Sequence, residues 1–412
     1  MKRMVLSVFG TDGVRAGVVA AARGINRRNL ALAGSAALLA GCQVVPRTET
    51  VVTAPPPAPT PEPSATALPS DATRHRVALL VPMGGNAAQV GQSLANATTM
   101  ALLDTASRDS STDSLRITTY DTSSGASAAA RRAIADGNKL ILGPLLADNV
   151  AAVEAVAGPA DVPAIAFSND ASVASNNTFI IGHTPEQSVA RSVQYARKNG
   201  SSNFAALFPE GDYGRKAFSA LQNSLSDFGG SLVGAESYAR GNTSIVSAAQ
   251  RLRTRGGYDT VLIAEGARLS IMAAPYLRSD GAEGTRLLGT ELWSGGSAIT
   301  RTRDVDGALF SAVSDGRFRR FSDSYEARFG TKPFRIATLG YDAVLLTLRI
   351  AQDWRVGDAF PKSRLYDRGG FVGVDGAFRF GRSGVAERAL EVRQVRGNQV
   401  VAVEAAPRSF SQ

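Results

Sequence analysis

The stretch HRVALLVPMGGNAAQVGQSLANATTMALLD, residues 75–104, decides the fold prediction. Residues 75–81 form a nearly continuous apolar run, typical of a strand buried on both faces, and Pro82-Met83-Gly84-Gly85 interrupts it. Asn86 with Gln89 then resembles a helix-start box. Apolar residues recur behind this box at helical spacing, namely Val90, Leu94, Ala97 and Ala101. The stretch therefore predicts a strand, a tight turn and a helix.

The turn in this stretch is a candidate ligand-facing segment. In an open α/β sheet, the turns at the carboxyl ends of the strands line the ligand crevice. We therefore expect residues 82–92 to face whatever the protein binds. The alternative is a turn that merely connects its strand to its helix.

Composition and charge are those of an ordinary globular chain. The 412 residues are 44% hydrophobic and 20% charged, enough for two domains of typical size. Five of the nine net positive charges lie within residues 1–41. The basic cluster at 251–255 has no aromatic residue and the one at 317–320 has Phe318 alone, so both clusters indicate solvated faces and no nucleic-acid partner. The alternative is that these clusters form a basic edge that binds a polyanionic polymer of the cell wall.

The N-terminal region carries an export signal. Leu30–Ala40 is an 11-residue apolar run, too short to span a bilayer and typical of a signal-peptide core. It ends in Leu39-Ala40-Gly41-Cys42, which resembles the lipobox of bacterial lipoproteins. That resemblance implies a signal peptide over 1–41 and a diacylated Cys42, the single cysteine of the chain; a lone buried thiol is the alternative. Gln43 in place of Asp implies the periplasmic face of the outer membrane by the lipoprotein sorting rule.

Residues 42–74 form a linker rich in Pro and Ala. Proline fixes an extended backbone and removes amide donors, so this segment predicts a semi-rigid spacer. At about 3.1 Å per residue, some thirty residues reach on the order of 90 Å. The globular part can therefore stand away from the lipid surface.

Strands and helices alternate after the linker, which implies parallel sheets. A second series of alternating elements starts near Thr184, so we expect two sheets. The expected strands are 75–81, 115–120, 139–142, 163–167, 179–182, 204–208, 231–238, 260–264 and 286–289. The expected helices include 126–135, 150–157, 213–228, 244–255, 269–277, 321–329 and 336–354. Residues 370–401 alternate with glycine punctuation and predict small strands and a hairpin.

Several motifs resemble a known fold. They are Ile141-Leu142-Gly143-Pro144-Leu145, Ala166-Phe167-Ser168-Asn169, Phe208-Pro209 through Asp212-Tyr213-Gly214, and Tyr325 through Pro333 with Tyr341-Asp342-Ala343. Their order and spacing over roughly 75–405 resemble the type I periplasmic binding protein fold of leucine/isoleucine/valine-binding receptors. The lipobox, the sequence VALLVPMGG and Gly376-x-Phe378-Arg379-Phe380 resemble most the penicillin-binding protein activator family, of the LppC and LpoA kind. The helical-repeat domain of better-known members is not expected in the segment before His75.

The resemblance implies two Rossmann-like lobes joined by crossovers around a cleft. Lobe one is expected to comprise about 75–183 plus 307–355, and lobe two about 184–306 plus 356–405. Crossovers of this kind permit hinge closure. The implied cleft or ligand-binding residues are Gly84, Gly85, Gly143, Pro144, Ser168, Asn169, Tyr213, Glu265 and Glu291. Each of these residues also has a purely structural explanation. The glycines could serve only to form turns, Ser168 and Asn169 could cap the backbone of a turn or helix, and Tyr213 could pack in the core.

One position departs from the amino-acid receptors of this fold. These receptors carry a serine three residues after the position of Pro144 that helps to hold the ligand carboxylate, and this chain has Ala147. The nearby Asp148 would repel a carboxylate. The resemblance therefore implies an altered cleft.

Catalytic and metal-binding motifs do not support an enzyme. His75 and His183 are the only histidines, and neither is followed by metal-ligand spacing. The chain has no Gly-x-Ser-x-Gly elbow and no Walker pattern after its strands. We therefore expect no catalytic residues, no cofactor and no metal site.

These features together favour a non-catalytic outer-membrane lipoprotein that binds and activates a peptidoglycan synthase, a bifunctional penicillin-binding protein. A periplasmic receptor for a small metabolite such as an amino acid, feeding an ABC transporter, is the alternative. A third hypothesis is that the protein attaches to the cell wall without regulating a synthase. A small-molecule ligand in the cleft is compatible with the first two.

Overall fold

The computed structural model describes residues 73–106, 114–241, 243–278, 284–295, 298–407 and 410. The expected signal peptide, Cys42 and nearly all of the expected linker lie outside these residues. Within the described ranges, no helix has the length and apolar character needed to cross a membrane.

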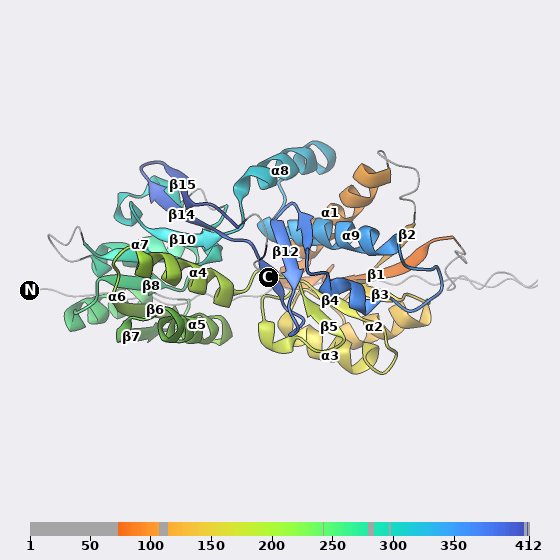
Figure 1. The fold of residues 1–412 in the computed structure, drawn as a ribbon, viewed down its shortest axis with the longest axis horizontal. Coiled ribbons are helices and arrows are strands. Elements are labelled where there is room, and N and C mark those ends of the chain that lie inside the picture. The colour runs from red at the N-terminus through yellow and green to blue at the C-terminus, as the bar shows by residue number, and fades with distance from the viewer. Residues whose placement is uncertain are drawn as a thin grey trace, which may run out of the picture. The chain divides into compact units, whose positions relative to one another are not determined.

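Lobe one is built on a five-stranded parallel sheet in the order β2-β1-β3-β4-β5 (Figure 1). The strands are β1 (His75–Val81), β2 (Leu115–Asp121), β3 (Leu140–Leu142), β4 (Ala164–Ala166) and β5 (Thr178–Ile180). One face is covered by α1 (Ala88–Ala106) and α9 (Thr338–Ala351), the other by α2 (Ala126–Ala135) and α3 (Ala147–Ala157). Alternate residues of β1 therefore enter two different cores.

Lobe two is built on a seven-stranded sheet in the order β15-β14-β10-β9-β8-β6-β7. Its parallel strands are β6 (Asn203–Pro209), β7 (Ser231–Tyr238), β8 (Thr260–Ile263), β9 (Arg286–Leu288) and β10 (Leu309–Ala312). The antiparallel hairpin of β14 (Glu391–Arg396) and β15 (Gln399–Glu404) extends the edge. One face is covered by α4 (Pro185–Lys198) and α5 (Asp212–Phe228), the other by α6 (Ser244–Arg255) and α7 (Ala267–Leu277).

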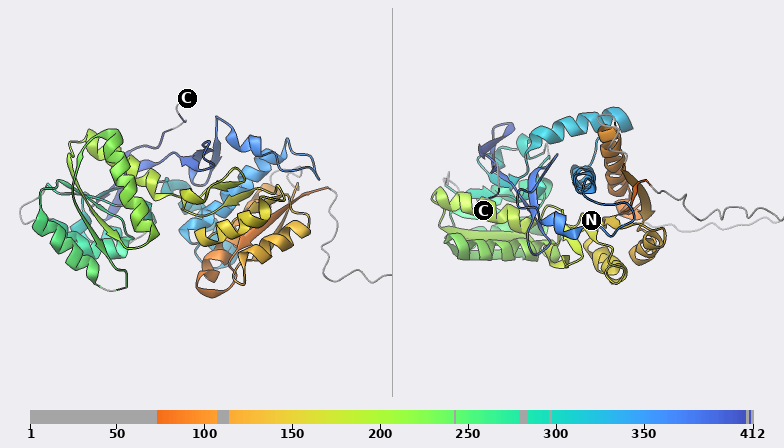
Figure 2. Two further views of the ribbon diagram at one scale, coloured as in Figure 1. Left: turned by 90° about the horizontal axis from the view of Figure 1, so that it is seen from below. Right: turned by 45° about the vertical axis from the view of Figure 1, so that its right-hand side comes forward.

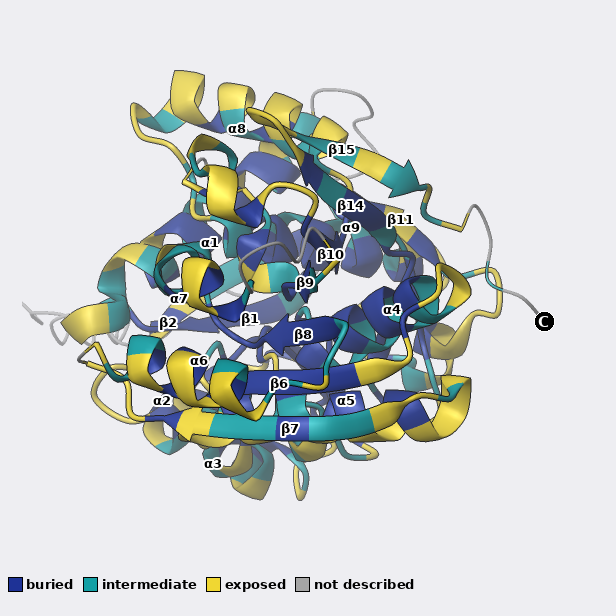
Figure 3. Ribbon diagram, turned by 90° about the vertical axis from the view of Figure 1, so that its left-hand side faces the viewer, coloured by how far each residue is buried: buried dark blue, intermediate teal, exposed yellow. Residues whose placement is uncertain are grey.

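Figure 2 shows helices on both faces of each sheet, and Figure 3 shows the central strands β6 and β8 buried almost throughout between exposed outer helix surfaces. This burial explains why these strands are apolar without alternation, as parallel strands covered on both faces are. The expected α/β class with two sheets is confirmed, and most expected elements lie within a few residues of their predicted bounds.

A small antiparallel sheet and one further helix complete lobe one. The sheet contains β11 (Phe371–Gly373), β12 (Gly376–Phe380) and β13 (Ala386–Arg388). Helix α8 (Asp315–Phe329) packs on α1 through Phe321 and Tyr325, which share a core with Ala97 and Met100. Short 3-10 turns join the larger elements: η1 (Gly85–Ala87), η3 (Ala171–Val173), η4 (Glu291–Trp293), η5 (Ile299–Arg301), η6 (Arg303–Val305), η7 (Arg335–Ala337) and η8 (Lys362–Tyr366).

Two of the expected lobe boundaries differ from the structure. Residues 309–312 were expected in lobe one but form β10, which pairs with β9 and β14 of lobe two. Residues 356–389 were expected in lobe two, yet Phe360, Leu365, Phe371 and Phe378 belong to the core beneath α1 and α9. The chain therefore passes between the lobes near 181–184, 313–314 and 389–390.

The opening stretch depends on a close approach between its helix and its turn. The chain makes the turn η1 before α1 begins, so the helix starts two residues after Asn86. A Cβ atom at Gly91 of α1 would lie 1.8 Å from the carbonyl oxygen of Pro82. Lobe two repeats this arrangement, because a Cβ at Gly214 of α5 would lie 1.8 Å from the carbonyl oxygen of Pro209. Each lobe thus requires glycine where α1 or α5 meets the end of the strand before it.

We expect Gly91→Ala and Gly214→Ala each to destabilise the protein by about 1–3 kcal/mol, because the added methyl group overlaps backbone and forces the helix outward. Gly316→Ala in α8 is the matched control. Its Cβ would meet nothing closer than Ser314 Oγ at 3.7 Å, so it should be neutral or stabilising by about 0.4–1 kcal/mol. Urea unfolding followed by circular dichroism measures all three; equal stability of Gly91→Ala and Gly316→Ala would contradict the packing argument.

Candidate functional site

The nine predicted cleft residues lie on both lobes, at the ends of strands or the starts of the helices that follow. Six of them follow the strands β1, β3 and β4 of lobe one, namely Gly84, Gly85, Gly143, Pro144, Ser168 and Asn169. Tyr213, Glu265 and Glu291 follow β6, β8 and β9 of lobe two. All of them therefore lie near the carboxyl ends of parallel strands, where open α/β sheets place ligands.

The lobe-one residues are explained mainly by backbone conformation and local contacts. Gly143 has φ +105°, and a Cβ there would lie 2.2 Å from the carbonyl oxygen of Leu80. The Ser168 hydroxyl accepts a hydrogen bond from the backbone N–H of Asp170 at 3.1 Å. A Cβ at Gly84 would lie 2.9 Å from the hydroxyl of Ser123. These contacts explain glycine and serine at these positions without a ligand.

The lobe-two residues make hydrogen bonds within their own lobe. The Tyr213 hydroxyl donates to Thr290 Oγ1 at 2.7 Å and lies 3.0 Å from Glu291 Oε1. Glu265 accepts hydrogen bonds from the Tyr238 hydroxyl at 2.7 Å and from Arg240 Nε at 2.8 Å. Burial and then the neighbouring Glu291 charge raise the pKa of Tyr213 well above its usual value, so it stays a neutral donor.

Glu291 is the predicted site residue with the most unusual environment. Its Oε2 atom is fully buried and has no hydrogen-bond partner in the described part of the chain. Burial raises the pKa of Glu291 to about 7, and the nearby charge of Glu186 adds to this effect. Glu291 is therefore partly protonated at neutral pH.

An ion pair joins the two lobes. Lys216 of α5 in lobe two is paired with Asp170, which follows β4 in lobe one. Burial would raise the pKa of Asp170, but the hydrogen bonds from Lys216 and Ser172 outweigh it, so the pKa is lowered. This pair links the two lobes directly.

A second bridge lies at the middle crossover. The buried Arg393 of β14 contacts Asp315, at the start of α8, with Nη1 2.5 Å from Oδ2. The Ser294 hydroxyl of lobe two lies 3.2 Å from the other oxygen of Asp315. Side chains of the protein itself therefore connect the two lobes at separate points.

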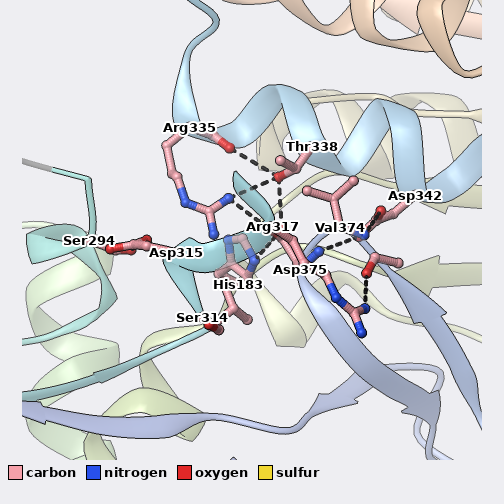
Figure 4. Close-up of polar contacts among 12 residues, drawn as sticks. His183, Ser294, Ser314, Asp315, Arg317, Arg335, Thr338, Asp342, Val374 and Asp375 are labelled. Carbon is pink, nitrogen blue, oxygen red and sulfur yellow. Dashed lines mark hydrogen bonds and ion pairs between the residues drawn. The ribbon is translucent and has the colours of Figure 1, made fainter. Parts of the chain in front are cut away.

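A polar cluster at the lobe junction was not predicted, and Figure 4 shows most of it. Asp375, fully buried between β11 and β12, lies 2.9 Å from His183 Nε2 and 2.7 Å from Arg335 Nη1. Thr338 Oγ1 donates to Asp375 Oδ2 at 2.8 Å. Burial would raise the pKa of Asp375, but Arg335 and His183 hold it well below its usual range. Asp375 is thus a permanent buried anion.

His183 and Asp342 respond to this anion in different ways. Burial lowers the pKa of His183 to about 4 although Asp375 opposes the shift, so the imidazole is neutral at pH 7. Asp342 is buried on α9 and accepts hydrogen bonds from the backbone N–H groups of Val374 and Asp375. Burial and the charge of Asp375 raise the pKa of Asp342 to about 7. The cluster therefore combines one fixed charge with groups that titrate.

A small cavity lies where this cluster meets lobe two. It has a volume of about 30 Å³ and is lined by His183, Thr184, Gln187, Ser188, Glu291, Ser294, Ala312, Val313, Arg335, Arg388 and Leu390. Of the nine predicted residues, Glu291 alone lines it. Within the described ranges, no three His, Cys, Asp or Glu side chains gather as a metal site would require.

The chain belongs to the periplasmic binding protein family, whose model matches residues 75–399. Membership in this family places the protein among periplasmic proteins, and the fold is that of type I periplasmic binding proteins. A curated relative, an uncharacterized protein of Rickettsia prowazekii, is 28% identical over 178 residues, which are 43% of this chain and 46% of that protein. The match thus spans about half the length of that relative.

Solved structures of the same fold include a putative branched-chain amino acid ABC transporter protein from Rhodospirillum rubrum. Its TM-score is 0.70 at 18% identity, with 80% of this chain and 100% of that chain covered. The LivJ substrate-binding protein of Streptococcus pneumoniae in complex with isoleucine matches with TM-score 0.61 at 17% identity, covering 81% of this chain and 99% of that chain. At these identities the likeness shows the fold alone.

We expect Glu291→Gln to stabilise the protein at pH 8 by about 1–2 kcal/mol and to leave its stability nearly unchanged at pH 5. Glu has an unfolded pKa of about 4.3, so a folded pKa of about 7 means stability that is complete below pH 4.3 and lost as the pH rises through 7. Glutamine cannot ionise and avoids this loss. Thermal unfolding from pH 5 to 8 measures the effect, with exposed Glu210→Gln as control; a difference independent of pH would contradict it.

Proposed function

We propose that this protein is a non-catalytic lipoprotein, anchored at the periplasmic face of the outer membrane, that binds and activates a peptidoglycan synthase. The observation that carries the proposal is a cleft occupied by the protein's own side chains. Lys216 is paired with Asp170 across the lobes, and Tyr213 is bonded to Thr290 and Glu291. A protein with such a cleft is better suited to act through its surface than to carry a solute.

The size of the lobe junction supports this proposal. Pockets for small molecules in proteins measure roughly 300–1,000 Å³. The cavity between the lobes measures about 30 Å³, which leaves no room for a whole amino acid in the arrangement described. A receptor function would require the lobes to move apart before a ligand of that size could enter.

The residue at position 147 also supports the proposal. In amino-acid receptors of this fold, a serine at the corresponding position helps to hold the ligand carboxylate. Ala147 is the first residue of α3 and carries no side-chain donor, and Asp148 adds a negative charge beside it. A free amino acid therefore lacks one expected contact and meets repulsion.

Two features of the N-terminal sequence support this location. The lipobox-like Leu39-Ala40-Gly41-Cys42 would provide a membrane anchor, and the Pro-rich linker would hold the domain at a distance from the membrane. Three acyl chains on Cys42 exceed the two that stable anchoring requires. A spacer with a reach on the order of 90 Å would carry the domain from the outer membrane toward the wall and its synthases. The resemblance to the penicillin-binding protein activators supports a synthase as the partner.

Adding the purified protein to a bifunctional synthase in lipid vesicles should speed glycan polymerisation or cross-linking several-fold. The synthase should also be retained on beads that carry the protein. An equal amount of an amino-acid receptor of the same fold is the control and should have no effect. Unchanged synthase rates together with no retention would sink the proposal.

Substituting Cys42→Ala should move the protein from the outer-membrane fraction to the soluble periplasm, because the acyl chains attach through this thiol. Gln43→Asp is a matched variant that keeps the thiol and, by the sorting rule, should redirect the protein to the inner membrane. Membrane fractionation with immunoblotting distinguishes the three locations. A Cys42→Ala variant that stays with the outer membrane would rule out the lipid anchor.

The second candidate function is a solute receptor that feeds a transporter. It is favoured by the type I fold and by the cavity between the lobes. A thermal-shift panel of amino acids, benzoate and short peptides separates the candidates, since a ligand at one hundred times its dissociation constant adds about 2.7 kcal/mol of stability. A shift of several degrees with any of them would favour the receptor.

A further inference from the structure

Strand β15 is an outer edge of the lobe-two sheet with little protection against pairing. It is the end strand of the sheet order and, among the described residues, pairs with β14 alone (Figure 3). Residues 399–403, with the sequence QVVAV, carry no charge and no proline. An edge strand presents one row of backbone N–H and C=O groups outward, so an uncharged edge of this kind can pair with a further strand.

Three other outer strands of the large sheets are protected. Strand β7, at the opposite end of the same sheet, contains Glu236, which pairs with Arg251 Nε at 2.8 Å and Arg255 Nη2 at 3.0 Å. Strand β2 of lobe one contains Arg116 and Asp121. Strand β5 is covered by the loop before β13. Charges and covering loops oppose pairing with another chain, so β15 is the edge where such pairing meets least opposition.

The pairing of β14 determines which backbone groups of β15 point outward. Val395 of β14 donates its N–H to Ala308 and accepts from the N–H of Gly307, so its backbone faces β10. Its partner across the hairpin is Val400. Residues of an antiparallel pair alternate between facing their neighbour and facing away. Val400 and Ala402 therefore present their N–H and C=O groups at the outer edge.

We propose that β15 is an interaction surface on which a second copy of this chain docks, by antiparallel pairing of the two β15 strands. The two-fold register that sets Val400 of one copy opposite Ala402 of the other allows about four backbone N–H···O bonds. It also sets the two copies of Val401 directly opposite each other. The two lobe-two sheets then form one continuous sheet.

A second copy suits this edge because the strand is complementary to itself. Directly opposed β-branched residues stabilise a strand pair, and this register opposes no two charged residues. The charged residue of the strand, Glu404, is held by Arg191 of its own lobe at 2.9 Å. Val400 and Val403 already pack on the two cores of lobe two, so little ordering remains to be done on pairing. The pairing goes beyond the proposed function, which requires only one copy.

The oligomeric state of the full-length Cys42→Ala protein tests the pairing, because neither acyl chains nor a disulfide can then join two copies. Sedimentation equilibrium from about 10 μM to about 1 mM should show a reversible dimer with a dissociation constant on the order of 100 μM, as expected for about four backbone hydrogen bonds and a facing valine pair.

A charge at the two-fold axis should control this dimer. In the same protein, Val401→Lys and Val401→Glu should each weaken dimerisation at least roughly 10-fold, because like charges then lie directly opposite each other. An equal mixture of the two variants should dimerise again, since opposite charges face each other. Thr119→Lys is the matched control. It adds the same charge at an exposed position of the edge strand β2 and should leave the dimer unchanged.

Ala402→Pro keeps the test sound if a charge at position 401 prevents folding. It removes an outward N–H and no bond to β14, so the circular dichroism spectrum should stay native while the dimer is lost. A Cys42→Ala protein that is monomeric at about 1 mM would overturn the proposal and leave the edge to a strand of another protein. Equal loss of the dimer in Thr119→Lys would overturn it as well. These measurements contain no synthase, so their failure leaves the proposed function untouched.

Discussion

Burial of the Asp375 carboxylate is the constraint on which the lobe junction depends. A buried charge costs several kcal/mol unless close partners compensate it. Here the partners come from distant parts of the chain: His183 on the first crossover, Arg335 in η7 and Thr338 at the start of α9. Meeting this requirement brings the first crossover against α9 and the small third sheet. The cavity between the lobes is bounded by the same His183 and Arg335.

Each lobe contains the same close approach between the end of a strand and the helix that follows it. Pro82 follows β1 and Pro209 ends β6, and a glycine in the next helix lets α1 or α5 approach the carbonyl oxygen of that proline. The approach aims the start of each helix at the junction. Tyr213 in the first turn of α5 contacts Thr290 and Glu291 at the start of η4, and Lys216 contacts Asp170 of lobe one. Local backbone sterics thus place the polar contacts.

Periodicity predicted the fold well because each parallel strand is covered on both faces and reads as an apolar run. It missed β10, although strands as short as β8 were predicted, and it did not show which core the apolar side chains of residues 356–389 join. In the site, Tyr213 and Glu291 were predicted and lie together. Arg335, Asp375 and Arg388 were missed, because charged residues paired across tens of positions look like surface residues in a single sequence.

The direct bonds between the lobes bear on how this protein can act. In a receptor of this fold, a ligand supplies part of the free energy that keeps the lobes closed. The fraction of closed molecules therefore depends on whether the ligand is bound. Here Lys216–Asp170 and Arg393–Asp315 supply lobe contacts from the chain itself. Closure then depends less on a solute in the cleft. A partner that recognises the arrangement held by these contacts would find its docking surface already formed.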